Sequence, residues 1–122
     1  RKVSDAGFTV GAHTQTHLSL SDRQNNDVIH NEVNGSIEMV RSELGTCDWF
    51  AYPNGTAADW SALAAKSVKS AGIKGAWTLE PGVLRDTNEY NRFRLPRYFV
   101  PKSLGRFNLL LNTALIRNKK TK

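Results

Sequence analysis

The sequence predicts one α/β domain in which short parallel strands alternate with helices. Along the 122 residues, the patterns follow the order strand, helix, strand, helix, strand, extended segment and helix, which favours parallel pairing. A content of 39% hydrophobic and 23% charged residues is typical of a globular protein. No run of 18 apolar residues occurs, so the sequence predicts no transmembrane helix.

The first third of the chain contains one strand pattern and one long helix pattern. Residues 1–7, RKVSDAG, are typical of the end of a helix, and we expect further sequence before them. Residues 7–12, GFTVGA, predict a buried strand. Ser21 and Gln24 form a capping-box pattern that predicts a helix start, and Gly45 is placed to end that helix. The apolar stripe of this helix comprises Ile29, Val33, Ile37, Val40 and Leu44.

The middle of the chain repeats this alternation. Residues 47–53, CDWFAYP, predict a second strand, and residues 73–79, IKGAWTL, predict a third. Between them, Thr56 and Asp59 form a second capping pattern, and Gly72 is placed to end the helix that follows. The apolar stripe expected for this helix comprises Trp60, Leu63, Ala64 and Val68.

The last third is less regular. Residues 80–91 predict a loop, and residues 92–100, RFRLPRYFV, predict an extended segment in which Pro96 indicates an edge or irregular strand. A C-terminal helix is expected from the spacing of Leu104, Phe107, Leu111 and Leu115. We therefore expect one domain over residues 1–116 and a basic tail over residues 117–122.

Charge and single residues limit the classes of function. The net charge is +6, but the aromatic residues are not interleaved with Lys and Arg, so no nucleic-acid partner is predicted. Cys47 is the only cysteine and is more typical of a core position than of a catalyst. His30 is interpreted as a structural or solvated residue of the first helix. Gly35 lies in the same helix, where glycine costs about 1 kcal/mol relative to alanine, and the sequence offers no reason for it.

Two histidines follow the first predicted strand. His13 and His17 lie in the segment GAHTQTHLSLS, and imidazole is a common metal ligand. In a strand, however, residues four apart would lie about 13 Å from one another, so a metal site requires the chain to turn at residues 14–16. Because parallel strands end at the same edge of a sheet, we expect residues 53–55 to lie beside this segment. Taken alone, a surface or hydrogen-bonded histidine pair is the commoner situation.

These segments, in the order GAHTQTHLSLS, FAYPNG and RLPR, resemble the polysaccharide deacetylase family, also called the NodB-homology or carbohydrate esterase family 4 domain. His13, Thr14 and His17 match the family's His-Ser/Thr-x-x-His motif. The resemblance implies that the two histidines bind a divalent metal, most often zinc, and that Thr14 braces their loop. It also implies a distorted (β/α) barrel, of which the N-terminal strands have no counterpart in this sequence.

The second matching motif is FAYPNG, residues 50–55. The resemblance implies that the backbone N–H of Asn54 helps to hold the oxyanion of a tetrahedral intermediate. The substrate-binding residues that it implies are Tyr52, Pro53 and Gly55. Many members carry Arg at the start of this motif, and here Arg97 is the implied substitute that orients the catalytic carboxylate, with Arg94 the weaker candidate. A surface salt bridge is an equally favoured interpretation of Arg97.

Two family motifs have no match. The family's Thr-Phe-Asp-Asp motif, which supplies the general base and a third metal ligand, is absent, and no histidine follows His30 to serve as the family's general acid. The leading hypothesis is a metal-dependent hydrolase that removes N-acetyl groups from an amino-sugar polysaccharide, outside the cell or at its envelope, with little activity in these residues alone. The alternative is a carbohydrate-binding or scaffold module without catalysis. A basic nucleic-acid-binding domain is a weaker third hypothesis.

Overall fold

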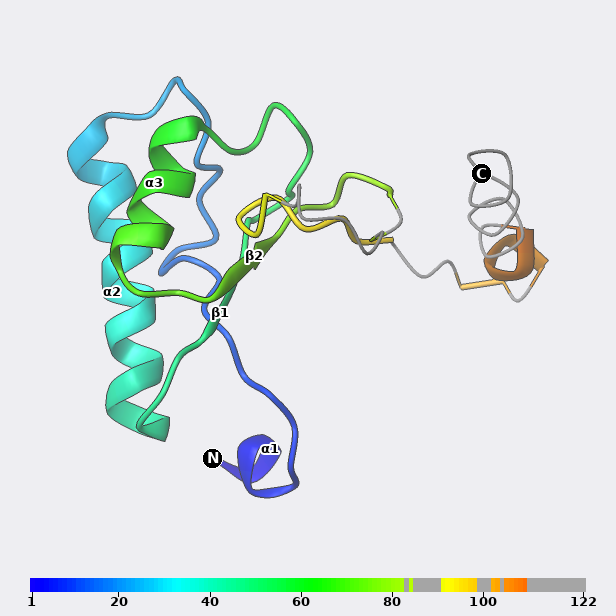
Figure 1. The fold of residues 1–122 in the computed structure, drawn as a ribbon, viewed down its shortest axis with the longest axis horizontal. Helices are drawn as coiled ribbons and strands as arrows, with labels where there is room; N and C mark the ends of the chain where they lie inside the picture. The colour runs from blue at the N-terminus through cyan, green and yellow to red at the C-terminus, as the bar shows by residue number, and fades with distance from the viewer. Residues whose placement is uncertain (83, 85–90, 99–101, 104, 110–122) are drawn as a thin grey trace.

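The computed structural model of the chain describes residues 1–82, 84, 91–98, 102–103 and 105–109. Its helices and strands are α1 (Lys2–Asp5), α2 (Asn26–Leu44), β1 (Trp49–Ala51), α3 (Ala62–Ser70) and β2 (Gly75–Trp77). Helices α2 and α3 pack against one another and lie to one side of the two strands, whereas α1 stands apart (Figure 1). The predicted α/β class is therefore confirmed for the described residues. None of their helices is both long and apolar enough to cross a membrane.

The strands pair in parallel, as predicted. Phe50 of β1 lies opposite Ala76 of β2. Isolated parallel bridges extend the sheet on both sides, from Ala12 to Phe50 and from Trp77 to Leu95. Four segments thus run in one direction, in the order Ala12 segment, β1, β2 and Leu95 segment, so the residues that follow them reach a single edge.

The hydrophobic core lies between the strands and the helices α2 and α3. Tyr52 is fully buried, and its ring lies 5.5 Å from the ring of Phe50 and 5.5 Å from that of Trp60, measured between centroids. Cys47 is buried in the same core, as predicted. The predicted stripe of α2 contributes Ile29, Val33 and Ile37 to the core, and Val40 packs against its margin.

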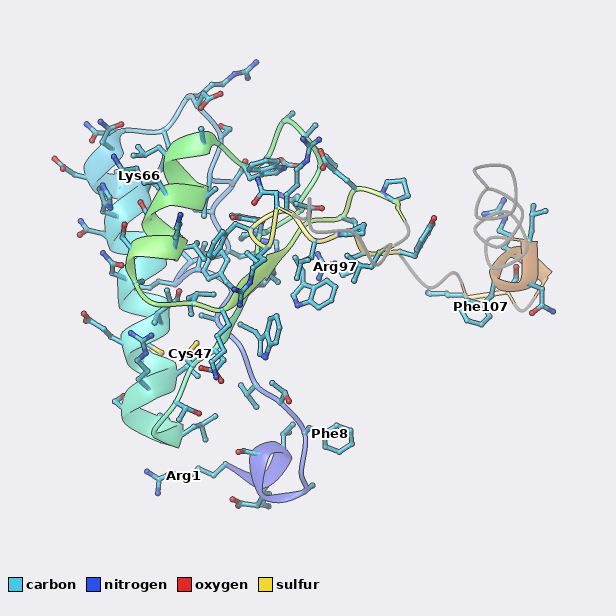
Figure 2. The ribbon with its side chains drawn as sticks, viewed as in Figure 1. Arg1, Phe8, Cys47, Lys66, Arg97 and Phe107 are labelled. Carbon is cyan, nitrogen blue, oxygen red and sulfur yellow. The ribbon has the colours of Figure 1, made fainter. Side chains whose placement is uncertain are left out.

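The prediction of a buried strand over residues 7–12 was wrong except at Ala12. Phe8 is 68% exposed and lies beside α1, away from the helical layer (Figure 2). Ala12 donates to the carbonyl of Trp49 and accepts from the N–H of Ala51 at 2.9 Å each. The upstream residues pair with no strand among the described residues, so their apolar composition finds no neighbour against which to become buried.

The start of α2 also differs from the prediction. The helix begins at Asn26, and the side chain of Asn25 accepts from the N–H of Asp27 at 2.8 Å. Ser21 instead accepts from the N–H of Gln24 through its carbonyl, in a turn that precedes the helix. Several residues in this segment could cap a helix, so the sequence allows more than one helix start. The turn at Ser21 moves the observed cap four positions along the chain, to Asn25.

The cap of α3 is displaced in the same way. Ser61 caps the helix by accepting from the N–H of Ala64 at 3.1 Å. Thr56 and Asp59 bond to one another in a separate turn, so Trp60 precedes the helix and does not belong to its stripe. The predicted helix end at Gly45 is confirmed, because its φ of +81° is left-handed and its N–H donates to the carbonyl of Arg41.

The C-terminal part is described only in pieces. Within residues 92–98, Leu95 forms the bridge to β2, which agrees with an irregular edge segment. Residues 105–109 are helical. Leu104, Leu111 and Leu115 of the predicted helix and the tail 117–122 lie outside the described residues.

Candidate active site

Three hydrogen bonds join the ends of the four parallel segments and the loops that follow them. The first links Nδ1 of His13 to the carbonyl of Ala51 at 2.6 Å. In the second, the N–H of Leu79 donates to the carbonyl of Gly55 at 2.7 Å. In the third, Nε of Arg97 donates to the carbonyl of Thr78 at 3.2 Å. His13 therefore contacts the last residue of β1, at the edge from which residues 53–55 continue.

The histidine segment makes the turn that binding of one metal ion by both histidines would require. Thr14 and His17 adopt left-handed backbone conformations, with φ of 60° and 61°. As a result, the ring centroids of His13 and His17 lie 4.9 Å apart, with an angle of 76° between the ring planes. An extended chain would have placed these residues about 13 Å apart.

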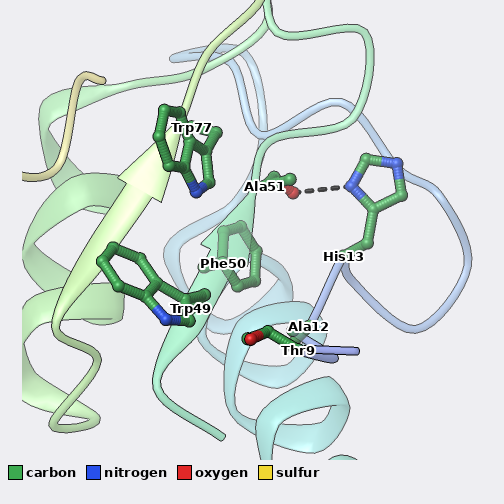
Figure 3. A pocket seen from close by; sticks show the side chains of 8 residues that line it. Thr9, Ala12, His13, Trp49, Phe50, Ala51 and Trp77 are labelled. Carbon is green, nitrogen blue, oxygen red and sulfur yellow. Dashed lines mark hydrogen bonds between the residues drawn. The ribbon is translucent and has the colours of Figure 1, made fainter. Parts of the chain in front are cut away.

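The contact of His13 with β1 determines which ring nitrogen carries its proton. Figure 3 shows the His13 ring directed at the carbonyl of Ala51. A carbonyl oxygen only accepts, so Nδ1 must be the donor and a neutral ring keeps its lone pair on Nε2. Metal-binding histidines commonly donate their second ring nitrogen in this manner. The arrangement therefore leaves His13 prepared to bind a cation through Nε2.

A buried carboxylate from α2 braces the middle of the loop. Glu32 is 9% exposed, and it accepts from the N–H of Gln15 and the N–H of Thr16, both at 2.9 Å, and from the hydroxyl of Thr16 at 2.7 Å. Burial alone would raise the pKa of Glu32, but the hydrogen bonds from Thr16 and Gln15 outweigh it and hold the pKa below its ordinary value.

Sequence reasoning missed Glu32, although a signal was available. It immediately precedes Val33 in the buried stripe of α2, and a charged residue on an apolar helix face requires a partner. The resemblance implied that Thr14 braces the loop, and this stays a prediction. The Thr14 hydroxyl oxygen is buried and has no hydrogen-bond partner in the described part of the chain, whereas Thr16 makes the bonds to α2.

A contact between the histidine loop and α2 explains why Gly35 lies in the interior of this helix. Gln15 reaches across the helix and donates through Nε2 to the carbonyl of Asn31 at 2.8 Å. A Cβ atom at Gly35 would lie 2.2 Å from that Nε2 atom. Glycine therefore gives the Gln15 side chain the room it needs on the helix surface.

Most of the FAYPNG motif, residues 50–55, is buried. Only Asn54 is exposed, and Ala51 is half-exposed. The hydroxyl of Tyr52 donates to the carbonyl of Phe93 at 3.0 Å inside the protein. Pro53 and Gly55 are also buried. Tyr52, Pro53 and Gly55 are thus buried next to the exposed Asn54, and their role in binding substrate stays a prediction.

The Asn54 turn requires the glycine that follows it. Asn54 has a φ of 56° and Gly55 a φ of 69°, both left-handed. A Cβ atom at Gly55 would lie 2.7 Å from the backbone nitrogen of Leu79. The turn is thus fixed against the end of β2.

The two candidate arginines occupy different environments. Arg94 forms a forked ion pair with Glu80, at 2.6 and 3.2 Å, and its guanidinium lies 5.3 Å from the centroid of the Trp60 ring. Arg97 is half-buried and, within the described residues, donates from its side chain to the carbonyl of Thr78 and forms no ion pair. The salt-bridge interpretation of Arg97 is therefore wrong for the described residues, and Arg94 is the arginine already engaged with a carboxylate.

An open cavity of about 500 Å³ lies beside His13 (Figure 3). Its walls include His13, Ala51 and the indoles of Trp49 and Trp77, whose ring centroids are 6.1 Å apart. Catalytic zinc typically takes three protein ligands. Two imidazoles fit that requirement in part, but no group of three or more His, Cys, Asp or Glu side chains able to hold a metal occurs among the described residues.

Comparisons with known proteins agree on one family. A family model described as polysaccharide deacetylase matches residues 1–76. No curated protein sequence matches the chain. Among solved structures, the deacetylase PplD of Streptococcus pyogenes, in complex with acetate, is 21% identical with a TM-score of 0.74, over 93% of this chain and 47% of that one. IcaB from Ammonifex degensii is 18% identical with a TM-score of 0.68, over 93% and 49%.

A third similar structure is described as a pseudoenzyme. BA3943 from Bacillus anthracis, a CE4 family pseudoenzyme, is 17% identical with a TM-score of 0.55, over 98% of this chain and 44% of that one. The chain thus spans less than half the length of each of these three proteins. Identities this low establish the fold alone, and the fold occurs in both a deacetylase and a pseudoenzyme.

Proposed function

Because the chain belongs to the polysaccharide deacetylase family, we propose that it forms part of an active site that hydrolyses N-acetyl groups on an amino-sugar polysaccharide. The polymer would be chitin-like, peptidoglycan or poly-N-acetylglucosamine, located outside the cell or at its envelope. We further propose that the four parallel segments belong to a distorted (β/α) barrel. The observation that carries this proposal is the turned histidine pair, with the Nδ1 proton of His13 held by β1.

Each predicted site residue at this edge would have a role in amide hydrolysis. His13 and His17 would hold a divalent cation, with zinc the expected metal. Such a cation supplies Lewis-acid polarisation of a carbonyl and lowers the pKa of bound water. The N–H of Asn54, in its fixed turn, would donate to the negative charge that develops on the acetamide oxygen. Arg97 would orient a carboxylate that acts as the base.

These residues do not include the whole catalytic set. The base, the third ligand and the general acid that the family uses have no counterpart in the sequence. We therefore propose that the 122 residues have little or no deacetylase activity by themselves. Addition of a segment that carries the family's Asp-Asp pair should be needed for turnover.

A carbohydrate-binding module without catalysis is the second candidate. The indoles of Trp49 and Trp77 line the cavity beside His13 and supply apolar surface on which a sugar ring could stack. A pseudoenzyme also occurs among the similar structures. This alternative predicts saccharide binding that is independent of any metal.

Zinc titration by calorimetry tests the leading proposal. The chain should bind zinc, and both His13→Ala and His17→Ala should abolish binding. His30→Ala is the matched control, because it removes a histidine whose ring bonds to Ser67 between the helices. A folded chain that binds no zinc would refute the metal site. Binding of N-acetylglucosamine oligomers without zinc would then favour the second candidate.

A further inference from the structure

The loop that carries the histidines is fixed at both ends by other segments. Ala12 is bonded to β1 on both of its backbone groups, and Leu20 forms a parallel bridge to Trp60. Between these anchors the backbone enters the left-handed region twice, at Thr14 and His17. Non-glycine residues in that region carry a conformational cost, which the surrounding contacts must offset.

The centre of the loop is held from α2. Two consecutive N–H groups, those of Gln15 and Thr16, point to one oxygen of Glu32, and the Thr16 hydroxyl reaches the other. Bonds to an ionised carboxylate are stronger than bonds between neutral groups. Because Glu32 is almost fully buried, water cannot readily replace it as the acceptor for these donors.

We infer that Glu32 is a positioning residue, which holds His13 and His17 in their turned geometry before any metal binds. It touches neither ring through the contacts described, so it acts through the backbone of residues 15–16. Loss of its carboxylate would leave two N–H groups without their acceptor and would free the loop to extend. The inference concerns the metal-free chain, and only its consequence for zinc affinity rests on the proposed function.

The first test needs no metal. Amide hydrogen exchange of residues 15 and 16, and the NOE between the two histidine rings, are measured by NMR in the wild type, Glu32→Gln and Glu32→Ala. We expect Glu32→Ala to lower the protection of these two amides about tenfold to a hundredfold and to weaken the NOE. Glu32→Gln should be intermediate, because its amide oxygen still accepts from the two N–H groups. Glu38→Ala, exposed on the same helix, is the matched control and should change neither signal.

Several results would overturn this inference. Unchanged protection and an unchanged NOE in Glu32→Ala would show that the carboxylate positions nothing. An equal loss of protection throughout the core would assign Glu32 to general stability instead. If Glu32→Ala does not fold, Glu32→Gln decides the question with the same two measurements, and wild-type values of both would overturn the inference.

Zinc affinity provides the second test. In a chain that binds zinc, Glu32→Ala should weaken binding about tenfold to a hundredfold at a temperature where the variant remains folded. Wild-type affinity in that variant would contradict the inference. If the wild type binds no zinc, the proposed metal site fails, whereas the metal-free measurements still decide the role of Glu32.

Discussion

Replacement of Gly35 by alanine tests the contact between the histidine loop and α2. In a helix interior, alanine is favoured over glycine by about 1 kcal/mol. Here the added methyl group would lie 2.2 Å from Nε2 and 2.5 Å from Cδ of Gln15. The side chain must therefore move away and lose its bond to the carbonyl of Asn31, which is worth about 1 kcal/mol net. We expect the two terms to cancel, so that Gly35→Ala changes the free energy of unfolding little.

A second background separates the two terms. In Gln15→Ala no side chain obstructs the methyl group, so Gly35→Ala should raise the free energy of unfolding by about 1 kcal/mol. The coupling between the two substitutions is then about 1 kcal/mol. Urea denaturation detects a difference of this size, because it corresponds to a shift in midpoint of roughly 0.3–1 M.

The matched control is Asn34→Ala, an exposed neighbour in the same helix. It should raise stability by a similar small amount in both backgrounds, since no loop residue depends on that position. If Gly35→Ala had the same effect with and without the Gln15 side chain, the reasoning would be refuted.

Three further predictions concern the carboxylate, the core tyrosine and the Asn54 turn. Because the pKa of Glu32 is lowered in the folded state, the stability that this carboxylate contributes should be present above about pH 4.3 and lost as the pH falls through the lowered folded value. Between pH 7 and 3, the free energy of unfolding should therefore fall less in Glu32→Gln than in the wild type. Tyr52→Phe should lower the free energy of unfolding by about 1 kcal/mol, since the carbonyl of Phe93 loses its donor, while zinc affinity stays unchanged. An altered zinc affinity would indicate a direct role of Tyr52 in the site. Gly55→Ala should lower the free energy of unfolding by more than about 2 kcal/mol, because an added Cβ meets both a left-handed φ and the backbone of Leu79. Gly45→Ala, at a left-handed position in open space, should lower it by only about 1–2 kcal/mol, and equal losses in thermal denaturation would contradict the close approach to Leu79.

The features that the sequence predicted correctly depend on local chemistry or on strand order. Gly45 ends α2 because a left-handed residue is cheap only for glycine. The shared edge of His13 and Asn54 followed from parallel pairing, which needs only the order of elements. The identity of the family followed from motif order, and it is confirmed over residues 1–76.

The features that were missed depend on contacts between distant segments. Nothing in the apolar pattern of residues 7–12 indicates whether a neighbouring strand is present, so Phe8 was wrongly placed inside. The caps at Asn25 and Ser61 lie close to other residues able to cap, and tertiary turns select between them. The role of Glu32 requires knowledge of which loop faces α2, and only the folded chain provides it.

The dependence of the histidine loop on α2 bears on how far its motif can be transferred. The five letters HTQTH contain the two proposed ligands, but the turn also depends on a carboxylate at position 32 and on an open helix surface at position 35. A loop transplanted to another protein without both features would carry the right side chains on an unsupported backbone. Equally, a survey of relatives by histidine spacing alone would count sequences whose supporting helix no longer matches. The unit to graft, or to search for, is therefore the loop together with α2.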